Sequence, residues 1–179
     1  MVIKRKGFTL LELVVAVGIM LIIAAAATPF LLSHIRDSKI AAVNENLINL
    51  KTAFDSYFTK EGGSITASNI LQDMVSKGWI SPIPEKNGMS WSVEATTGAS
   101  GNAYYVFING NAEALKYFGD LVGDLDKSVD GTDGADAGRL LYKKTTTQGQ
   151  EDLDICYLLY KDPGFTPNQQ ETWAGTNCQ

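Results

Sequence analysis

The sequence predicts an α+β protein in which one long N-terminal helix packs on a small antiparallel β-sheet. Three observations predict this fold: an apolar run up to residue 32, apolar residues recurring every three or four positions over 35–58, and short β-branched or aromatic runs further on. We expect four segments: a basic leader at 1–7, an apolar helix at 8–34, its amphipathic continuation at 35–60 and an α+β head at 61–179.

The apolar segment is long enough to cross a membrane. Leu13–Leu32 is 20 residues, or about 30 Å of helix, which equals the hydrocarbon thickness of a bilayer. A soluble core helix would show a polar stripe, and none occurs between Leu13 and Ala27. A cleaved signal peptide is the other alternative, because Lys4–Lys6 is basic and Ala24–Ala26 is small. Glu12 disfavours it, since a carboxylate costs about 2.5–3.5 kcal/mol at the bilayer centre.

The helix changes character after Pro29. Pro29 removes a backbone donor and Gly18 weakens the helix, so we expect the span between them to bend or unwind locally. The following half is amphipathic, which predicts a single helix from about Phe8 to Lys60 with one face on the head. Its apolar positions are Ile35, Ile40, Val43, Leu47, Leu50, Phe54, Tyr57 and Phe58.

The head is large enough for one compact domain. Glu61–Ser64 contains two glycines that end the long helix. Turn residues then separate two predicted helices from four predicted strands. We expect a short helix from Ile70 capped by Asn69, strands at 91–96 and 103–108 forming a hairpin, a helix at 112–122, and strands at 139–146 and 154–160 around the polar link Thr147–Gln150.

A short basic leader precedes the junction Gly7-Phe8-Thr9-Leu10-Leu11-Glu12, and an apolar helix that contains Pro29 follows it. This arrangement resembles the processing site of type IV prepilins and type II secretion pseudopilins. The resemblance covers about residues 1–57. It implies that a prepilin peptidase cuts between Gly7 and Phe8 and that the new Phe8 amine is N-methylated. It also implies a structural filament subunit rather than an enzyme, with identical subunits, other pilins and an inner-membrane assembly platform as partners.

Glu12 then has a predicted role in assembly. A carboxylate on a lipid-facing helix needs a cation or a donor, and in a stack of identical subunits the nearest cation is the amine of a neighbouring Phe8. The alternative is a headgroup-level charge favoured by the helix dipole. Lys4, Arg5 and Lys6 keep the leader cytoplasmic. We therefore expect the chain in a bacterial inner membrane first, and in a periplasm-spanning or surface filament afterwards.

The two cysteines, Cys156 and Cys178, both fall in the segment expected outside the cytoplasm. An oxidising compartment favours a disulfide between them. In the chain-entropy model, a loop of about 20 residues closed in this way contributes about 3 kcal/mol to the free energy of unfolding. Pilins commonly carry such a C-terminal loop, which this pair resembles.

The acidic stretch at 124–136 is a candidate calcium-binding site. Its five carboxylates could supply the oxygen ligands that Ca²⁺ takes, although Ala137 stands where a helix-loop-helix calcium site has its bidentate Glu. A solvated acidic loop is the alternative, and we expect no required cofactor. The five carboxylates belong to Asp124, Asp126, Asp130, Asp133 and Asp136.

Charge and motif content narrow the function classes. The chain has 15 basic and 20 acidic residues, three of the basic ones in the leader. An acidic exported domain should be repelled by nucleic acid. No nucleophile stands near a base and no phosphate-binding loop follows a strand, so we expect no enzyme. The prediction is a type IV pilus-like subunit, with a type II secretion pseudopilin or a minor tip, adhesive or DNA-uptake pilin as alternatives.

Overall fold

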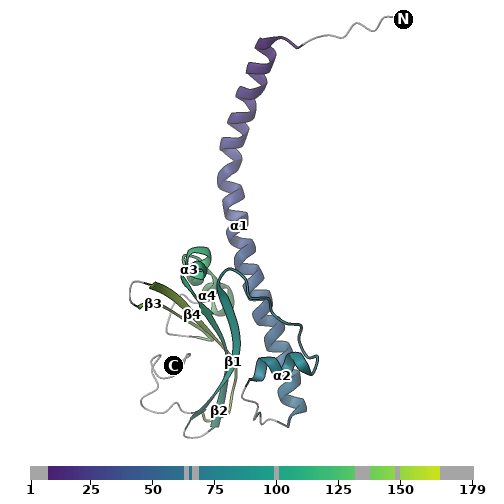
Figure 1. The fold of residues 1–179 in the computed structure, drawn as a ribbon, viewed down its shortest axis with the longest axis vertical. Coiled ribbons are helices and arrows are strands. Elements are labelled where there is room, and N and C mark those ends of the chain that lie inside the picture. Colours follow the sequence, from purple (N-terminus) through teal and green to yellow (C-terminus); the bar gives the residue numbers. More distant parts are fainter. Residues whose placement is uncertain are drawn as a thin grey trace, which may run out of the picture. The chain divides into compact units, whose positions relative to one another are not determined.

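The computed structural model describes residues 8–62, 65, 69–98, 101–131, 138–147 and 150–165, which contain four helices and four strands (Figure 1). The chain divides into two units, Met1–Ser38 and Lys39–Gln179. Within the described residues, the first unit is the N-terminal part of helix α1 (Leu10–Lys60), and the second holds the remainder of α1 and the head. The α+β class predicted from the sequence is confirmed.

The long helix α1 matches the predicted single helix from about Phe8 to Lys60. Pro29 lies inside it. Every residue between Gly18 and Pro29 is α-helical, so the expected local unwinding does not occur. The Thr28 hydroxyl donates to the Ala24 carbonyl at 2.8 Å. This bond lies beside the carbonyl of Ala25, which loses its helical donor because Pro29 has no N–H.

The four strands form one antiparallel sheet in the order β1-β2-β4-β3. β1 pairs with β2 and β3 pairs with β4, and pairing between β2 and β4 joins these two hairpins at the centre of the sheet. The hairpin of the first two strands was predicted. Three strands are longer than predicted, whereas the third has the predicted length and is shifted by one residue. β4 starts four residues before Asp154, and Thr147 and Gln150 at the two ends of the expected polar link belong to strands. The bounds are β1 Met89–Gly98, β2 Gly101–Gly110, β3 Leu140–Thr147 and β4 Gln150–Lys161.

The core lies between one face of the sheet and the head portion of α1. Alternate residues of β2 point to this core, and Val106 pairs with Val93 on one side and Tyr157 on the other. Phe54 on α1 is fully buried, with its ring 5.3 Å from Tyr104. The α1 side chains that enter the core are those at helical spacing: Val43, Leu47, Leu50, Phe54 and Tyr57. They were predicted to form that face.

A polar cluster attaches the short helix α2 (Ile70–Ser76) to the end of α1. The buried Tyr57 hydroxyl donates to Asp73, and the Lys77 ammonium lies 2.9 Å from Asp73 and 2.8 Å from Glu61. Burial and the bond to Asp73 raise the pKa of Tyr57 to about 12. The hydrogen bonds from Tyr57 and Lys77 hold the pKa of Asp73 below its usual range. α2 itself starts where predicted, with Asn69 accepting from the Gln72 N–H.

Asp73→Asn is expected to lower the melting temperature at neutral pH. A carboxyl whose pKa is depressed by folding stabilises the protein above its unfolded pKa, and this stability is lost as pH falls through the folded value. The difference between variant and wild type should therefore shrink below about pH 4, the unfolded pKa of Asp. Thermal melts between pH 3 and 7 measure it. A difference that stays constant over that range would contradict the role of the Asp73 charge.

The region predicted as one helix at 112–122 is two helices, α3 (Ala112–Phe118) and α4 (Val122–Asp130). Gly119 separates them, and its N–H donates to the Leu115 carbonyl at 2.7 Å. A Cβ at Gly119 would collide with that carbonyl oxygen. The glycine thus permits a tight helix end that the apolar spacing alone did not reveal. The second helix extends into the acidic stretch, so the loop expected from Asp124 onward is helical as far as Asp130.

A tight turn before β1 depends on Gly88. Asn87 and Gly88 have φ values of 54° and 70°, and the Met89 N–H donates to the Lys86 carbonyl at 3.1 Å. Two successive positive φ values are the mark of a type I′ turn. A Cβ at Gly88 would also collide with the side chain of Asn111, whose Oδ1 accepts from two N–H groups at the start of α3. The turn and the Asn111 cap of α3 are therefore compatible only when residue 88 is glycine.

Gly88→Ala is expected to lower the free energy of unfolding by about 2 kcal/mol or more, through backbone strain and displacement of the Asn111 cap. Gly78→Ala is the matched control: its φ is 77°, but nothing lies within 4 Å of the added Cβ. Denaturant unfolding of both variants separates strain from collision. Equal losses in the two variants would show that the Asn111 contact contributes nothing.

Candidate processing and assembly site

The N-terminus of α1 is closed by a reciprocal pair of hydrogen bonds between Thr9 and Glu12. The Glu12 N–H donates to Thr9 Oγ1 at 3.3 Å, and Glu12 Oε2 accepts from both the Thr9 N–H and the Thr9 hydroxyl at 3.0 Å. This is a capping box, in which the first and fourth residues satisfy each other's backbone donors. Glu12 therefore has an intramolecular role that we did not predict, although the Thr-x-x-Glu spacing in the sequence signals it.

The residues predicted to be processed lie just before this cap. Phe8 is 88% exposed, and Gly7 falls outside the described residues. Phe8 itself lies two residues before the first residue of α1, Leu10. Neither cleavage nor methylation is tested by this geometry, and both stay predictions.

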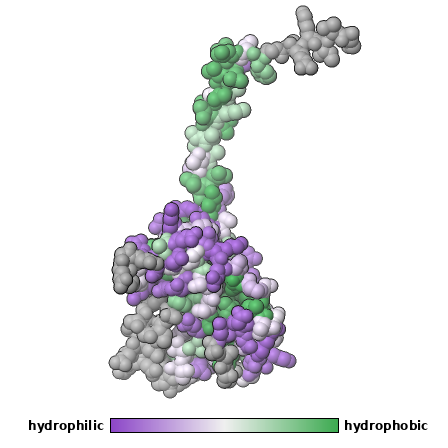
Figure 2. Space-filling model, in the orientation of Figure 1, coloured by the Kyte–Doolittle hydropathy of each residue, from purple (hydrophilic) through white to green (hydrophobic). Residues whose placement is uncertain are grey.

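The first unit exposes an almost wholly apolar helix surface (Figure 2). By length and composition α1 is the one helix among the described residues that could cross a membrane. Its large apolar side chains are exposed among the described residues, and in water such a surface would favour association or membrane insertion. They are Leu10, Leu11, Leu13, Val14, Val15, Val17, Ile19, Met20, Leu21, Ile22, Ile23, Phe30, Leu31, Leu32 and Ile35.

The acidic stretch is only partly described. Asp124, Asp126 and Asp130 lie on α4, where Asp124 is exposed and Asp126 is buried, while Asp133 and Asp136 fall outside the described residues. The alternative of a wholly solvated loop is therefore wrong for Asp126. Asp130 Oδ2 accepts the N–H groups of Arg139 at 2.6 Å and Leu140 at 2.9 Å, and so joins the end of α4 to the start of β3.

Calcium binding by this stretch stays a prediction. The described residues contain no group of three or more acidic, His or Cys side chains placed to hold a metal. Calorimetric titration of the protein with Ca²⁺ tests the hypothesis. If Ca²⁺ binds, we expect measurable heat and a higher melting temperature, since a ligand of the native state stabilises it. Absence of both effects would leave Asp130 with its structural role alone.

The two cysteines are also only partly placed. Cys156 is fully buried on β4 beside Phe107, on the sheet face opposite the main core. Cys178 falls outside the described residues, so the disulfide stays a prediction. If the disulfide forms, Cys156, which is buried on the central strand β4, would tie the C-terminal end of the chain to the sheet.

Comparison with known proteins bears on the N-terminal region. Residues 3–28 match the family model of the prokaryotic N-terminal methylation motif. The match includes Gly7, Phe8, Glu12 and most of the apolar run. None of the curated proteins and none of the solved structures matches the chain. Residues 3–28 thus identify it as a protein that carries the signature of type IV pilins and pseudopilins.

Proposed function

We propose that the chain, once cut between Gly7 and Phe8 and methylated at Phe8, is a structural subunit of a type IV pilus-like filament. The observation that carries the proposal is the methylation motif at residues 3–28 followed directly by an exposed apolar helix. Such a helix has two ways to leave water, insertion in the bilayer and burial among the same helices of other subunits. Insertion in the bilayer would apply to the precursor, and burial among the helices of other subunits would apply to the filament.

The cap geometry is compatible with a contact between Glu12 and a neighbouring Phe8. Glu12 Oε2 accepts from Thr9, and an ionised carboxylate has further lone pairs for a cation. In the proposed filament, the methylated amine of Phe8 supplies that cation. Pairing between subunits would then set the axial step, while apolar helix packing supplies cohesion. Prepilin peptidase and an inner-membrane assembly platform are the proposed partners before assembly.

Intact-mass spectrometry of the protein from sheared surface filaments and from membranes tests the proposal. We expect a chain that begins at Phe8, carries one added methyl group, lacks two hydrogens because of the disulfide, and is abundant in the sheared fraction. Gly7→Ala should leave the uncleaved precursor in the membrane. A chain beginning after Ala26 would instead identify a secretory signal peptide and overturn the proposal.

A pseudopilin of type II secretion, or a minor pilin, is the alternative that the same motif allows. Either would have the same processed mass but would stay in the membrane fraction. The distribution of the mass between the two fractions therefore decides between a major pilus subunit and these alternatives.

A further inference from the structure

Two Asn-Gly pairs lie next to each other at one end of the sheet. Asn87–Gly88 forms the turn before β1, and Asn109–Gly110 ends β2. Met89, which follows the first pair, is the strand partner of Gly110. In an Asn-Gly pair the main-chain nitrogen of glycine can attack the preceding side-chain amide with little hindrance, because glycine has no side chain. The two sites therefore carry the same intrinsic chemistry on two different backbones.

The reacting groups of the Asn87 site are not engaged elsewhere. Among the hydrogen bonds of the described residues, none involves the Asn87 side chain and none is donated by the Gly88 N–H. Asn87 is partly exposed. One main-chain hydrogen bond in the described part of the chain, from the Met89 N–H to the Lys86 carbonyl, spans the turn. Breaking one bond at a surface turn is a local fluctuation that leaves the core intact, so the turn can reach the conformation needed for attack.

The Asn109 site has the same dipeptide on a fixed backbone. Asn109 and Gly110 are paired with β1 on one side and β4 on the other. Asn109 Nδ2 donates to Asp154 Oδ1 at 2.8 Å, which holds the side-chain amide in place. Asn109 is itself exposed, so access of water does not distinguish the two sites. To bring the Gly110 nitrogen to the Asn109 side chain, the centre of the sheet would have to separate.

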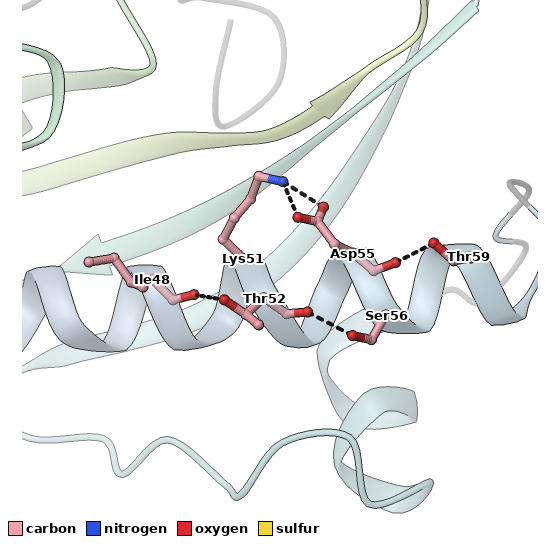
Figure 3. A network of polar contacts seen from close by, with 6 residues as sticks. All are labelled: Ile48, Lys51, Thr52, Asp55, Ser56 and Thr59. Atoms are coloured by element: carbon pink, nitrogen blue, oxygen red, sulfur yellow. Dashed lines mark hydrogen bonds and ion pairs between the residues drawn. The ribbon is translucent and has the colours of Figure 1, made fainter.

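The asparagines of α1 are held by the helix. Asn44, Asn46 and Asn49 precede residues with side chains, and the N–H that would attack lies within a regular helix, where it donates to a carbonyl. Figure 3 shows that this helix also engages side-chain hydroxyls, since Thr52 donates to the Ile48 carbonyl at 2.9 Å. The turn at residue 87 thus differs from both the helix and the sheet.

We infer that Asn87 deamidates spontaneously in the folded protein, whereas Asn109 is protected. The Gly88 nitrogen bonds to the side-chain carbonyl carbon of Asn87, and the bond from that carbon to Nδ2 breaks. The proton of the attacking nitrogen passes through solvent to the departing amino group, which leaves as ammonia. Water then opens the cyclic imide. Opening at the side-chain carbonyl gives aspartate, and opening at the main-chain carbonyl gives isoaspartate, whose backbone runs through the former side chain.

Isoaspartate at this position would disturb the start of α3. The Gly88 carbonyl accepts from the Asn111 N–H at 3.1 Å, and a Cβ on Gly88 would collide with the Asn111 side chain. Gly88 therefore sits tightly against the residue that caps α3. Isoaspartate lengthens the backbone of the turn by one methylene, which moves Gly88 relative to Asn111 and weakens the cap.

Peptide mapping of the full-length protein, kept folded in detergent at mildly alkaline pH, tests the inference. Chymotrypsin cuts at aromatic residues between the two sites, so each site gives its own peptide. We expect Asn87 to become aspartate and isoaspartate at least about tenfold faster than Asn109 while the sheet is intact. In denaturant, both sites should convert at similar rates. Equal rates in the folded protein, or faster conversion at Asn109, would overturn the inference.

The matched variant is Asn87→Gly, because glycine tolerates the φ of 54° and has no side-chain amide. After the same incubation, the melting temperature of the wild type should fall in proportion to its isoaspartate content, and that of Asn87→Gly should stay constant. An equal fall in both proteins would contradict the role of Asn87. A wild type that contains isoaspartate but melts as before would contradict the link between the turn and the Asn111 cap.

Discussion

Glu12→Ala is expected to abolish filament assembly while cleavage after Gly7 proceeds normally. In the proposed filament, the substitution would leave the amine of a neighbouring Phe8 without its anion in an apolar environment. Breaking a buried ion pair by removing one partner costs about 3–5 kcal/mol. That is more than a hundredfold in each subunit contact, and it recurs along the whole filament. Sheared filament yield, together with the intact mass of the membrane fraction, measures both parts of the expectation.

The capping box makes a sharper control necessary. Glu12 also accepts hydrogen bonds from Thr9, so Glu12→Ala removes a helix cap as well as a charge. Glu12→Gln keeps a residue suited to the box but removes the charge. Thr9→Val removes the hydroxyl, at a cost of about 1 kcal/mol in helix stability, and keeps the charge. If the ion pair matters, the glutamine variant fails to assemble and the valine variant assembles. The reverse pattern would assign Glu12 to capping alone.

Phe54→Ala is expected to have the largest effect on the stability of the head, with a loss of about 3–5 kcal/mol in the free energy of unfolding. The Phe54 side chain is fully buried between α1 and the sheet, with ring centroids 5.7 Å from Phe58 and 5.3 Å from Tyr104. Its removal leaves a cavity at the point where the helix meets β2. Denaturant unfolding of the purified protein, followed by tryptophan fluorescence, measures the loss.

Ile48→Ala is the matched control on the same helix. Ile48 is 55% exposed, so truncation should change the free energy of unfolding by no more than about 0.5 kcal/mol. Similar losses in the two variants would mean that Phe54 does not connect α1 to the sheet in the way its burial indicates.

The sequence predicts most where periodicity is long and uniform. The 3.6-residue pattern over Val43–Tyr57 identifies every α1 residue that the core buries. Asn69 and Gly78 mark the two ends of α2 because capping and turn chemistry are local. All four strands were found, but three of them were predicted with shorter bounds. Polar residues at strand ends, such as Glu151 and Asp152, lack the apolar alternation on which a strand prediction depends, yet the neighbouring strand still pairs with them.

The candidate site was predicted in part. Gly7, Phe8 and Glu12 belong to a short contiguous motif, so no tertiary information is needed to find them. The capping role of Glu12 was missed, although Thr9 stands at the required spacing. The acidic stretch was misread at Asp126 because a carboxylate on an amphipathic helix of nine residues is easily taken for a loop residue. Asp126 is buried in the folded head, where α4 contacts β3, and this packing cannot be read from the residue pattern of α4 alone.

The sequence by itself determined the long apolar helix, its charged start and the amphipathic surface that follows, because each depends on residues within a few turns of one another. Tertiary structure alone decided the burial of Asp126 and the attachment of α2 through Tyr57 and Asp73. The physical reason is that these features arise from contacts between segments distant in the chain, whose energies local propensity does not contain.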